Sequence, residues 1–463
     1  MKSRRLLSVL ILCVLLAAAG CGGGGDEGGD GGDQSITFWV AEDVAQRVAA
    51  IKTIVGRFTE QSGIQVNTVA IGEDQLASQI QSASAGGTLP DVMGPLSLGF
   101  VQNLATDDLA DADAANDVVE SLGRDTFSER ALSLVTVDGK PMGVPSDTWT
   151  QLLVYRKDLF EKAGLETPDT YDKILAAATK LNQSGQAGIV AATKAGESFT
   201  EQTFEYFALA NGCQLTDDQG GITLATPQCV GTFKFYNDLI TQGSTKGGQD
   251  VDTTRAAYFA GKAAMIVWSS FLLDELAGLR NDALPTCSEC RSDKQFLSDN
   301  SGVVTSISGT GGGQPTQFGE ISSYAIIKDG NIDAAKRFVE FMMSDGYTDW
   351  LAITPEGRFP TRSGTKDNPQ EYTEAWSKME VGVDSKAPLS ELYSPEVLEA
   401  LTKSTDTMSR WGFQQGQGKI MGALAAEQPI PKALADMLDG QLTPDAAAQQ
   451  AQADVEEIAQ SIE

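Results

Sequence analysis

Residues 35–69 read SITFWVAEDVAQRVAAIKTIVGRFTEQSGIQVNTV, and this stretch decides the fold class. Residues 36–40 form a short apolar strand, after which apolar side chains recur at helical spacing until Gly63 ends the helix. Residues 64–69 alternate as a second strand, and a second helix leads to a third strand at 91–93. Strands that alternate with helices predict an α/β fold whose parallel sheet is covered on both faces.

The length of the chain favours two domains. The protein has 463 residues, whereas one hydrophobic core rarely extends beyond about 250–300 residues. The alternation returns in the middle of the chain, where residues 171–181 carry a helical apolar stripe and residues 188–191 form a strand. Ligands of such sheets bind beyond the carboxyl ends of the strands, which places the residues after Val40 and Met93 near any ligand.

The N-terminus has the features of a bacterial export signal. A basic start precedes an apolar run from residue 6 to residue 19, which is too short to span a membrane comfortably. The run ends at Ala18-Ala19-Gly20-Cys21, which resembles the lipobox of bacterial lipoproteins and implies acylation of Cys21. We therefore expect a signal peptide at residues 1–20. The alternative is an ordinary signal peptide cut near Gly20, with Cys21 incidental.

Residues 21–34 consist almost entirely of Gly, Asp and Glu, and this composition predicts a tether. A segment without apolar side chains has nothing to bury, so we expect it to act as a flexible leash between a lipid and the folded region. No later segment reaches the roughly 18 consecutive apolar residues of a membrane span. The sequence thus predicts an exported protein held at the outer face of the cell membrane through Cys21.

The composition argues against several classes of function. The chain has 34 basic and 63 acidic residues and a net charge of −29, which disfavours binding to nucleic acid and adhesion to anionic lipid. It contains no histidine, which removes the usual Ser-His-Asp and Cys-His forms of catalysis and the commonest zinc ligand. We expect no metal site, no cofactor and no enzymatic activity.

Four cysteines follow the tether, and an even number in an exported domain suggests two disulfides. Three pairings are possible, and sequence proximity favours Cys213–Cys229 and Cys287–Cys290. The second pair is a C-x-x-C motif, so a redox function is the alternative. Its setting is a polar loop at residues 285–292, which favours a structural bond.

Four segments, taken in order, resemble the family 1 extracellular solute-binding proteins of bacterial ABC importers. The most specific is DGKPMGVP at 138–145, followed by LVYRKDLFEKAGL at 153–165, which is similar to the family's D-G-K-x-x-G-x-P and Y-N-K-D-L-F-x-x-A-G. Two departures, Arg156 for the usual Asn and PDTY at 168–171 for the usual P-x-T-W, point to a divergent ligand group. The other segments are GGTLPDV at 86–92, YFAGKAAMI at 258–266, and residues 326–343.

The resemblance implies a two-lobed, periplasmic-binding-protein-like fold similar to that of maltose-binding protein, with a hinge and a ligand cleft between the lobes. The chain would cross between the lobes near residues 149–152, return near 302–308 and cross again near Gly346. A monomeric protein of this kind closes on a small ligand and delivers it to ABC permease subunits in the membrane. The expected lobes are residues 35–149 with 303–346, and residues 150–302 with 347–463.

A sugar, the expected ligand, stacks its apolar faces on aromatic rings and binds its hydroxyls to carboxylates, amides and Arg. The expected arrangement holds a neutral carbohydrate between Trp149 and Trp268, with Asp43 on its hydroxyls. The alternative for each tryptophan is a place in the core, which we expect for Trp350 and Trp376. The predicted ligand-binding residues are Trp39, Glu42, Asp43, Gly94, Pro95, Ser97, Trp149, Glu197, Trp268, Ser269, Tyr324, Arg358 and Trp411.

Two other classes of function stay open at this point. A secreted carbohydrate-cleaving enzyme would need paired carboxylates, such as Asp107-Asp108 or Asp217-Asp218, although both pairs lie in polar, turn-like stretches. A sensory or adhesive lipoprotein would use the same fold to bind a ligand without transport. Turnover of oligosaccharides would favour the enzyme, and the absence of neighbouring permease genes would favour the sensor.

Replacing Cys21 with Ser should release the protein from the membrane fraction, because serine offers no thiol for the lipid. Cell fractionation followed by immunoblotting measures the distribution. The parent chain should sediment with the membranes, and membrane retention of Cys21→Ser would contradict the lipid anchor.

Overall fold

The central feature of the computed structural model is a nine-stranded sheet with the order β10-β6-β9-β3-β1-β2, on which β7, β8 and β13 pair with β6 or β9. The structure describes residues 35–311, 314–413 and 415–462. The expected signal peptide, the tether and Cys21 lie outside these residues. Two short two-stranded sheets accompany the main one.

The first half of the fold is a parallel α/β unit. β1 (Ser35–Ala41) lies between β2 (Gln65–Ile71) and β3 (Val92–Leu96) and pairs in parallel with both. Because side chains alternate across a strand, β1 buries Phe38 on one face and packs Trp39 on the other. Helices cover both faces, as the sequence predicts: α1 (Ala45–Ser62), α4 (Ala112–Leu122) and α13 (Ile332–Met342) on the Phe38 side, and α2 (Glu73–Gly86) and α3 (Leu98–Thr106) on the Trp39 side.

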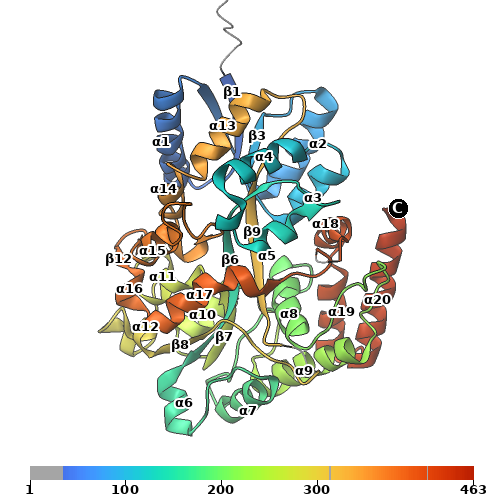
Figure 1. Cartoon of the computed structure of the whole chain (residues 1–463). Coiled ribbons are helices and arrows are strands. Elements are labelled where there is room, and N and C mark those ends of the chain that lie inside the picture. Colours follow the sequence, from blue (N-terminus) through green and yellow to red (C-terminus); the bar gives the residue numbers. More distant parts are fainter. Residues whose placement is uncertain (1–34, 312–313, 414, 463) are drawn as a thin grey trace, which may run out of the picture. The chain divides into compact units, whose positions relative to one another are not determined.

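Two long antiparallel strands, β6 (Val144–Arg156) and β9 (Gln317–Ile326), join the two halves of the fold (Figure 1). β6 pairs with β9 as far as Thr150, and from Gln151 onward it pairs with β7 (Met265–Ser269) and β8 (Ser301–Val304). A single strand of 13 residues therefore belongs to both halves. The exchange of partners marks the place where the chain passes between them.

The return of the chain differs from the sequence expectation. Residues 302–308 stay with the second half, because β8 pairs with the end of β6 and the backbone carbonyl of Ser308 accepts a hydrogen bond from Tyr171. The return is made by β9, which also pairs with β3. Residues 308–316 are polar and rich in glycine, so no hydrophobic pattern indicates where the chain turns back. The lobe boundaries themselves stay a prediction.

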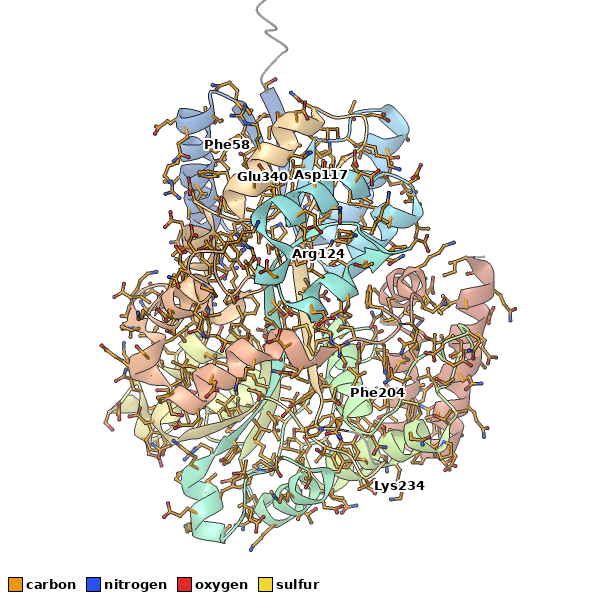
Figure 2. The ribbon with its side chains drawn as sticks, in the orientation of Figure 1. Phe58, Asp117, Arg124, Phe204, Lys234 and Glu340 are labelled. Atoms are coloured by element: carbon orange, nitrogen blue, oxygen red, sulfur yellow. A yellow bond between two sulfur atoms is a disulfide. The ribbon has the colours of Figure 1, made fainter. Side chains whose placement is uncertain are left out.

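The second half of the fold carries helices on both sides of β7. Strand alternation sends Met265 and Val267 toward one core and Ile266 and Trp268 toward the other. Figure 2 labels one aromatic side chain from each half, Phe58 on α1 and Phe204 on α8, and they belong to different cores. The first side holds α7 (Tyr171–Leu181), α8 (Ser198–Ala210), α9 (Pro227–Gly243), α18 (Gly418–Glu427), α19 (Pro429–Leu438) and α20 (Pro444–Ser461); the second holds α10 (Val251–Phe259), α11 (Leu272–Leu276), α12 (Phe296–Asn300) and α17 (Pro395–Thr407).

Residues 188–191, expected as a strand, form only an isolated bridge to β7, from Val190 to Ile266, and the preceding Ala187 bridges Ala263 just before β7. The remaining elements are short: α5 (Glu129–Leu134), α6 (Lys157–Ala163), α14 (Tyr347–Leu351), α15 (Glu371–Ser377), α16 (Leu389–Leu392), β4 (Thr136–Val137), β5 (Lys140–Pro141), β10 (Phe359–Pro360), β11 (Glu380–Val381), β12 (Ala387–Pro388), β13 (Met408–Ser409), and the 3₁₀ turns η1 (Arg124–Thr126), η2 (Asn281–Ala283), η3 (Glu289–Arg291) and η4 (Pro355–Gly357).

The structure brings the four downstream cysteines together in the pairs that sequence proximity favours. The sulfur atoms of Cys213 and Cys229 lie 2.08 Å apart, and those of Cys287 and Cys290 lie 1.99 Å apart. All four side chains are buried. Among the residues that the structure describes, no helix has both the length and the apolar character needed to cross a membrane.

Candidate functional site

A cavity of about 770 Å³ lies beside the crossing strands β6 and β9. Its volume falls within the range of about 300–1,000 Å³ that is usual for small-molecule sites. Both halves of the fold contribute to its walls, and we call it the cleft cavity. Its lining is Ala41, Glu42, Arg47, Leu76, Ala77, Pro95, Ser97, Gly99, Phe100, Asn103, Asp147, Trp149, Ser198, Glu201, Gln202, Glu205, Phe271, Glu320, Ser322, Thr354, Gly357, Arg358, Arg410, Phe413, Met421, Gly422 and Ala425.

The two crossing strands send four side chains into the cleft cavity. Asp147 lies opposite Ser322, and Trp149 lies opposite Glu320 in the antiparallel register. Alternate residues of a strand share one face, so these two cross-strand pairs present an acid, a hydroxyl, an aromatic ring and a second acid side by side. The ring of Trp149 is half-buried and packs 5.9 Å from that of Phe318.

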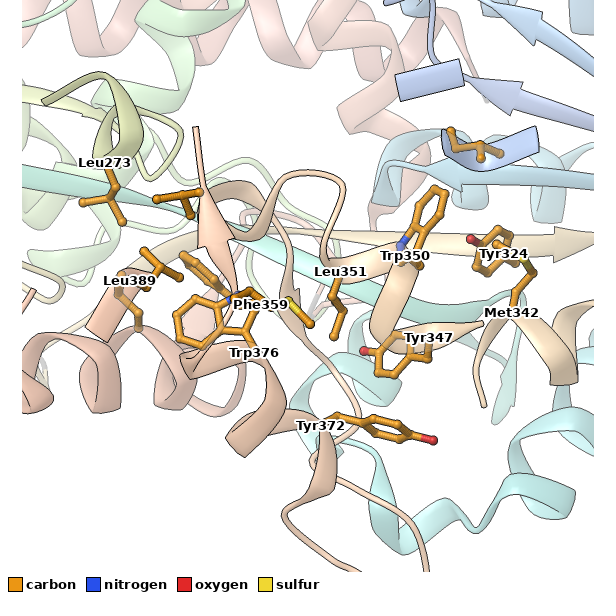
Figure 3. Close-up of a cluster of buried hydrophobic side chains, with 14 of the residues drawn as sticks. Leu273, Tyr324, Met342, Tyr347, Trp350, Leu351, Phe359, Tyr372, Trp376 and Leu389 are labelled. Atoms are coloured by element: carbon orange, nitrogen blue, oxygen red, sulfur yellow. The ribbon is translucent and has the colours of Figure 1, made fainter. Parts of the chain in front are cut away.

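Arg358 connects two acidic residues at one end of the cleft cavity. Its guanidinium lies 4.0 Å from the carboxylate of Glu42 and 3.9 Å from that of Asp147. It also lies 3.9 Å from the centre of the Trp350 ring, and Trp350 packs against Tyr324 behind the wall (Figure 3). Because a buried charge needs a partner, this end of the cavity holds its ions in pairs.

Arg410 connects two further acids of the lining of the cleft cavity. Its Nε lies 3.2 Å from Glu205 on α8, and its Nη1 donates to Glu320 on β9. Glu320 in turn accepts a hydrogen bond of 2.9 Å from the backbone N–H of Leu98, at the start of α3. One guanidinium thus links α8 to β9 and, through Glu320, to α3. Burial nevertheless raises the pKa of Glu205, against the opposing charge of Arg410.

Glu201 lines the cleft cavity one helical turn before Glu205. Its side chain is 7% exposed, and its closest polar contact in the described residues is the Gln428 amide, whose Nε2 lies 3.4 Å from Oε2. No ion pair joins it to a cation in the part of the chain that the structure describes. Burial, together with the charge of Glu205, raises the pKa of Glu201 from 4.5 to about 7, although Arg410 opposes this shift.

Five of the residues predicted from the sequence line the cleft cavity: Glu42, Pro95, Ser97, Trp149 and Arg358. They come from the loop after β1, the end of β3, β6 and the turn after η4, so the carboxyl ends of parallel strands do supply part of the wall.

Three of the predicted aromatic residues lie in the cores instead. The indole N–H of Trp268 donates to the Val251 carbonyl, because β7 extends to Ser269 and turns Trp268 inward. Trp411 is fully buried and donates to the Cys213 carbonyl. Tyr324 is also fully buried beneath Trp350. The structure therefore does not form the expected sandwich of a ligand between Trp149 and Trp268.

The other predicted residues also lie outside the lining of the cleft cavity, each for a local reason. Asp43 is exposed, and its neighbour Glu42 takes the inward position. Trp39 packs on the core beneath α2 and α3, and Gly94 lies against the ring of Tyr324. Glu197 forms an ion pair of 2.9 Å with Lys194. Ser269 lies opposite Gln151 in the pairing of β7 with β6.

The sequence interpretation missed most of the charged lining, including Asp147, Glu201, Glu205, Glu320 and Arg410. Two features of the sequence point to part of this charged lining. Glu201 and Glu205 lie four residues apart in a helix that is otherwise largely apolar, and Arg410 directly precedes the predicted site residue Trp411. The acid pairs considered for an enzyme do not line the cavity: Asp107 and Asp108 lie outside it, and Asp217 accepts backbone hydrogen bonds from Gln219 and Gly221.

Within the described ranges, no group of three or more Cys, Asp or Glu side chains is arranged to hold a metal ion. The cleft cavity combines aromatic rings with paired and unpaired carboxyl groups. Such a surface can stack on an apolar face and bind the polar rim of a small molecule.

Comparisons with known proteins agree on one family. The family model described as "Bacterial extracellular solute-binding protein" matches residues 41–349. The "Putative ABC transporter periplasmic-binding protein YcjN" of Escherichia coli (strain K12) is 30% identical over 348 residues, which cover 72% of this chain and 76% of that protein. The "Arabinooligosaccharide-binding protein" of Bacillus subtilis (strain 168) is 25% identical over 219 residues, or 45% of this chain and 48% of that one.

A solved structure shows the same two-lobed fold. "Maltose bound T. maritima MalE3" superposes with a TM-score of 0.68 at 20% identity, and the match covers 92% of this chain and 99% of that one.

Glu201→Gln should change the pH dependence of stability. Between about pH 4.5 and pH 7 the folded protein holds a proton that the unfolded chain releases, so the free energy of unfolding of the parent falls as pH rises through this window. The variant lacks this titration and should gain about 2 kcal/mol over the parent between about pH 5 and pH 8. Denaturant unfolding of parent and variant at both pH values measures the difference in their free energies of unfolding.

Glu161→Gln, on the exposed surface of α6, is the matched control and should differ from the parent equally at both pH values. An effect of Glu201→Gln that does not vary with pH would show that Glu201 titrates normally.

Proposed function

Because this chain belongs to the bacterial extracellular solute-binding protein family, we propose that it captures a sugar or short oligosaccharide in the cleft cavity and delivers it to an ABC permease. The observation that carries the proposal is the lining of the cavity, where the half-buried ring of Trp149 lies among carboxyl groups. Relatives whose names refer to an arabinooligosaccharide and to maltose support a carbohydrate ligand.

The polar groups of the cavity suit a rim of hydroxyls. Carboxylates accept hydrogen bonds from hydroxyl groups, and guanidinium groups donate to hydroxyl oxygens. The proposed ligand contacts therefore include Glu42 and Asp147 with Arg358, and Glu205 with Arg410. In this proposal Trp149 stacks on a sugar ring, with the Phe100, Phe271 and Phe413 rings as further apolar surface.

Hinge closure is the proposed mechanism of capture. A ligand that touches both halves stabilises the arrangement in which both contact it, and rotation about β6 and β9 changes their separation with little change inside each half. The proposed lobes keep the sequence boundaries at the first crossing, near residue 150, and move the return to β9.

The family is an extracellular one, and we propose that the chain is exported by the leader at residues 1–20 and anchored through Cys21 as a monomer. An exported protein meets oxidising conditions, so both cysteine pairs should be oxidised, Cys213–Cys229 and Cys287–Cys290. Closing the first loop should contribute about 3 kcal/mol to stability.

Intact-mass measurement of the exported protein before and after reduction tests whether both cysteine pairs are oxidised. Reduction should add the mass of four hydrogens, and alkylation of the unreduced, unfolded protein should label none of the four cysteines. Label at any of them, or peptide mapping that joins Cys213 to Cys287, would contradict the proposed pairing.

Trp149→Ala should weaken sugar binding about thirtyfold, because loss of a stacking ring in a desolvated pocket costs about 2 kcal/mol. A thermal-shift screen of sugars first identifies a ligand, since a molecule that binds only the folded state raises its stability. Calorimetric titration of parent and variant with that sugar then gives the two affinities.

Tyr155→Ala is the matched control, because Tyr155 is a half-buried aromatic residue of the same strand that lies outside the cleft cavity and packs on Phe160. It should bind like the parent. Equal affinity of Trp149→Ala and the parent would mean that the sugar is held elsewhere.

A further inference from the structure

The lining of the cleft cavity has more acidic than basic side chains. Five acidic side chains line it, against three arginines and no lysine. Each arginine already lies beside acids of the lining: Arg47 and Arg358 beside Glu42, Arg358 beside Asp147, and Arg410 beside Glu205 and Glu320. The acid left without an ion-pair partner among the described residues is Glu201.

We propose that Glu201 binds a protonated amine of the ligand, so that the preferred solute is an amino sugar rather than a neutral one. This inference rests on the proposed function, because it assigns a chemical class to the ligand of the same cavity.

Burial is the first reason for this assignment. Glu201 is only 7% exposed, yet within the described residues its side chain makes no ion pair and only a long hydrogen bond, from the Gln428 amide. A carboxylate removed from water without a cation is unfavourable, and a partner that arrives with the ligand restores the missing interaction. An ammonium donor supplies the short, charge-assisted hydrogen bond that the amide does not.

The geometry of α8 is the second reason. Ser198, Glu201 and Glu205 occupy positions i, i+3 and i+7 of one helix and all line the cleft cavity. An ammonium group has three donors. It can therefore bind Glu201 and still reach an oxygen of Ser198 or Glu205, which face the cavity one turn before and one turn after.

The same groups disfavour an anionic ligand. A phosphate or uronate would have to approach guanidinium groups that carboxylates already flank, and it would meet Glu201 and Glu205 on α8. Like charges in a partly desolvated cavity repel strongly. The lining also includes Met421, Gly422 and Ala425 of α18, which offer apolar surface to the body of a sugar ring whose amine is bound at α8.

Matched sugars test the proposal with the full chain. Glucose, galactose and mannose are each titrated beside their 2-amino-2-deoxy and N-acetyl forms, which differ in charge at one position, and glucuronate serves as the anionic probe. At neutral pH at least one amino sugar should bind tenfold or more tightly than its hydroxyl and acetamide counterparts. Isothermal titration calorimetry measures each affinity.

Glu201→Gln should remove that preference, since the amide keeps the shape of the side chain but not its charge. Glu161→Gln, exposed on α6, should keep the full preference. The pH-dependent unfolding described above shows independently whether Glu201→Gln folds.

The outcomes separate the two proposals. Equal binding of amino and neutral sugars, tighter binding of glucuronate, or a preference that survives in Glu201→Gln would overturn the amine assignment and leave the sugar function intact. Failure of every sugar in the panel and of every sugar and oligosaccharide in the thermal-shift screen to bind would overturn the proposed sugar function, and the amine assignment with it.

Discussion

The antiparallel pairing of β6 with β9 is the constraint on which the site depends. Because β6 exchanges β9 for β7 and β8 after Thr150, the two halves share one strand instead of being joined by a loose linker. The cleft cavity lies on the face of this ladder that presents Trp149 and Glu320. Rotation of the halves about these strands would therefore change the shape of the cleft cavity that the strands line, which couples the geometry of the cavity to the angle between the halves.

Buried ion pairs link the elements that surround the cleft cavity. Arg358 joins a loop after β1 to β6, and Arg410 joins α8 to β9. Ion pairs taken out of water contribute little net stability, because the attraction between the charges only offsets the loss of hydration. They do penalise strongly any arrangement that leaves one partner alone. The paired arginines therefore act mainly to fix the relative positions of the elements around the cavity.

The sequence predicts the scaffold well and the site less well, and the reason is physical. The α/β pattern of residues 35–93 is local, because alternation and helical spacing are set by neighbours in the chain. The direction in which a tryptophan points depends on strand ends and tertiary packing. Trp149 faces the cavity, whereas Trp268 and Trp411 turn inward to bond backbone carbonyls. Successive residues of a strand point to opposite faces of the sheet, so the face on which a side chain lies depends on where the strand ends. β7 ends at Ser269, one residue beyond Trp268, and Trp268 therefore keeps its inward orientation. The return through β9 was also missed, since polar residues before it carry no periodicity.

The order of strands in the main sheet has a consequence for how the chain assembles. β9 lies between β3 and β6, although more than two hundred residues separate it from β3 in sequence. The helix that follows it, α13, brings Phe338 against Phe38 and Phe58. A nascent chain that ends before residue 317 thus lacks both the strand that bridges β3 to β6 and the ring that completes this aromatic cluster. Contacts of such long range are slow to form. The first half of the fold is begun by residues 35–96 and completed only by β9 and α13, so it cannot be complete before residues 317–342 have been synthesised.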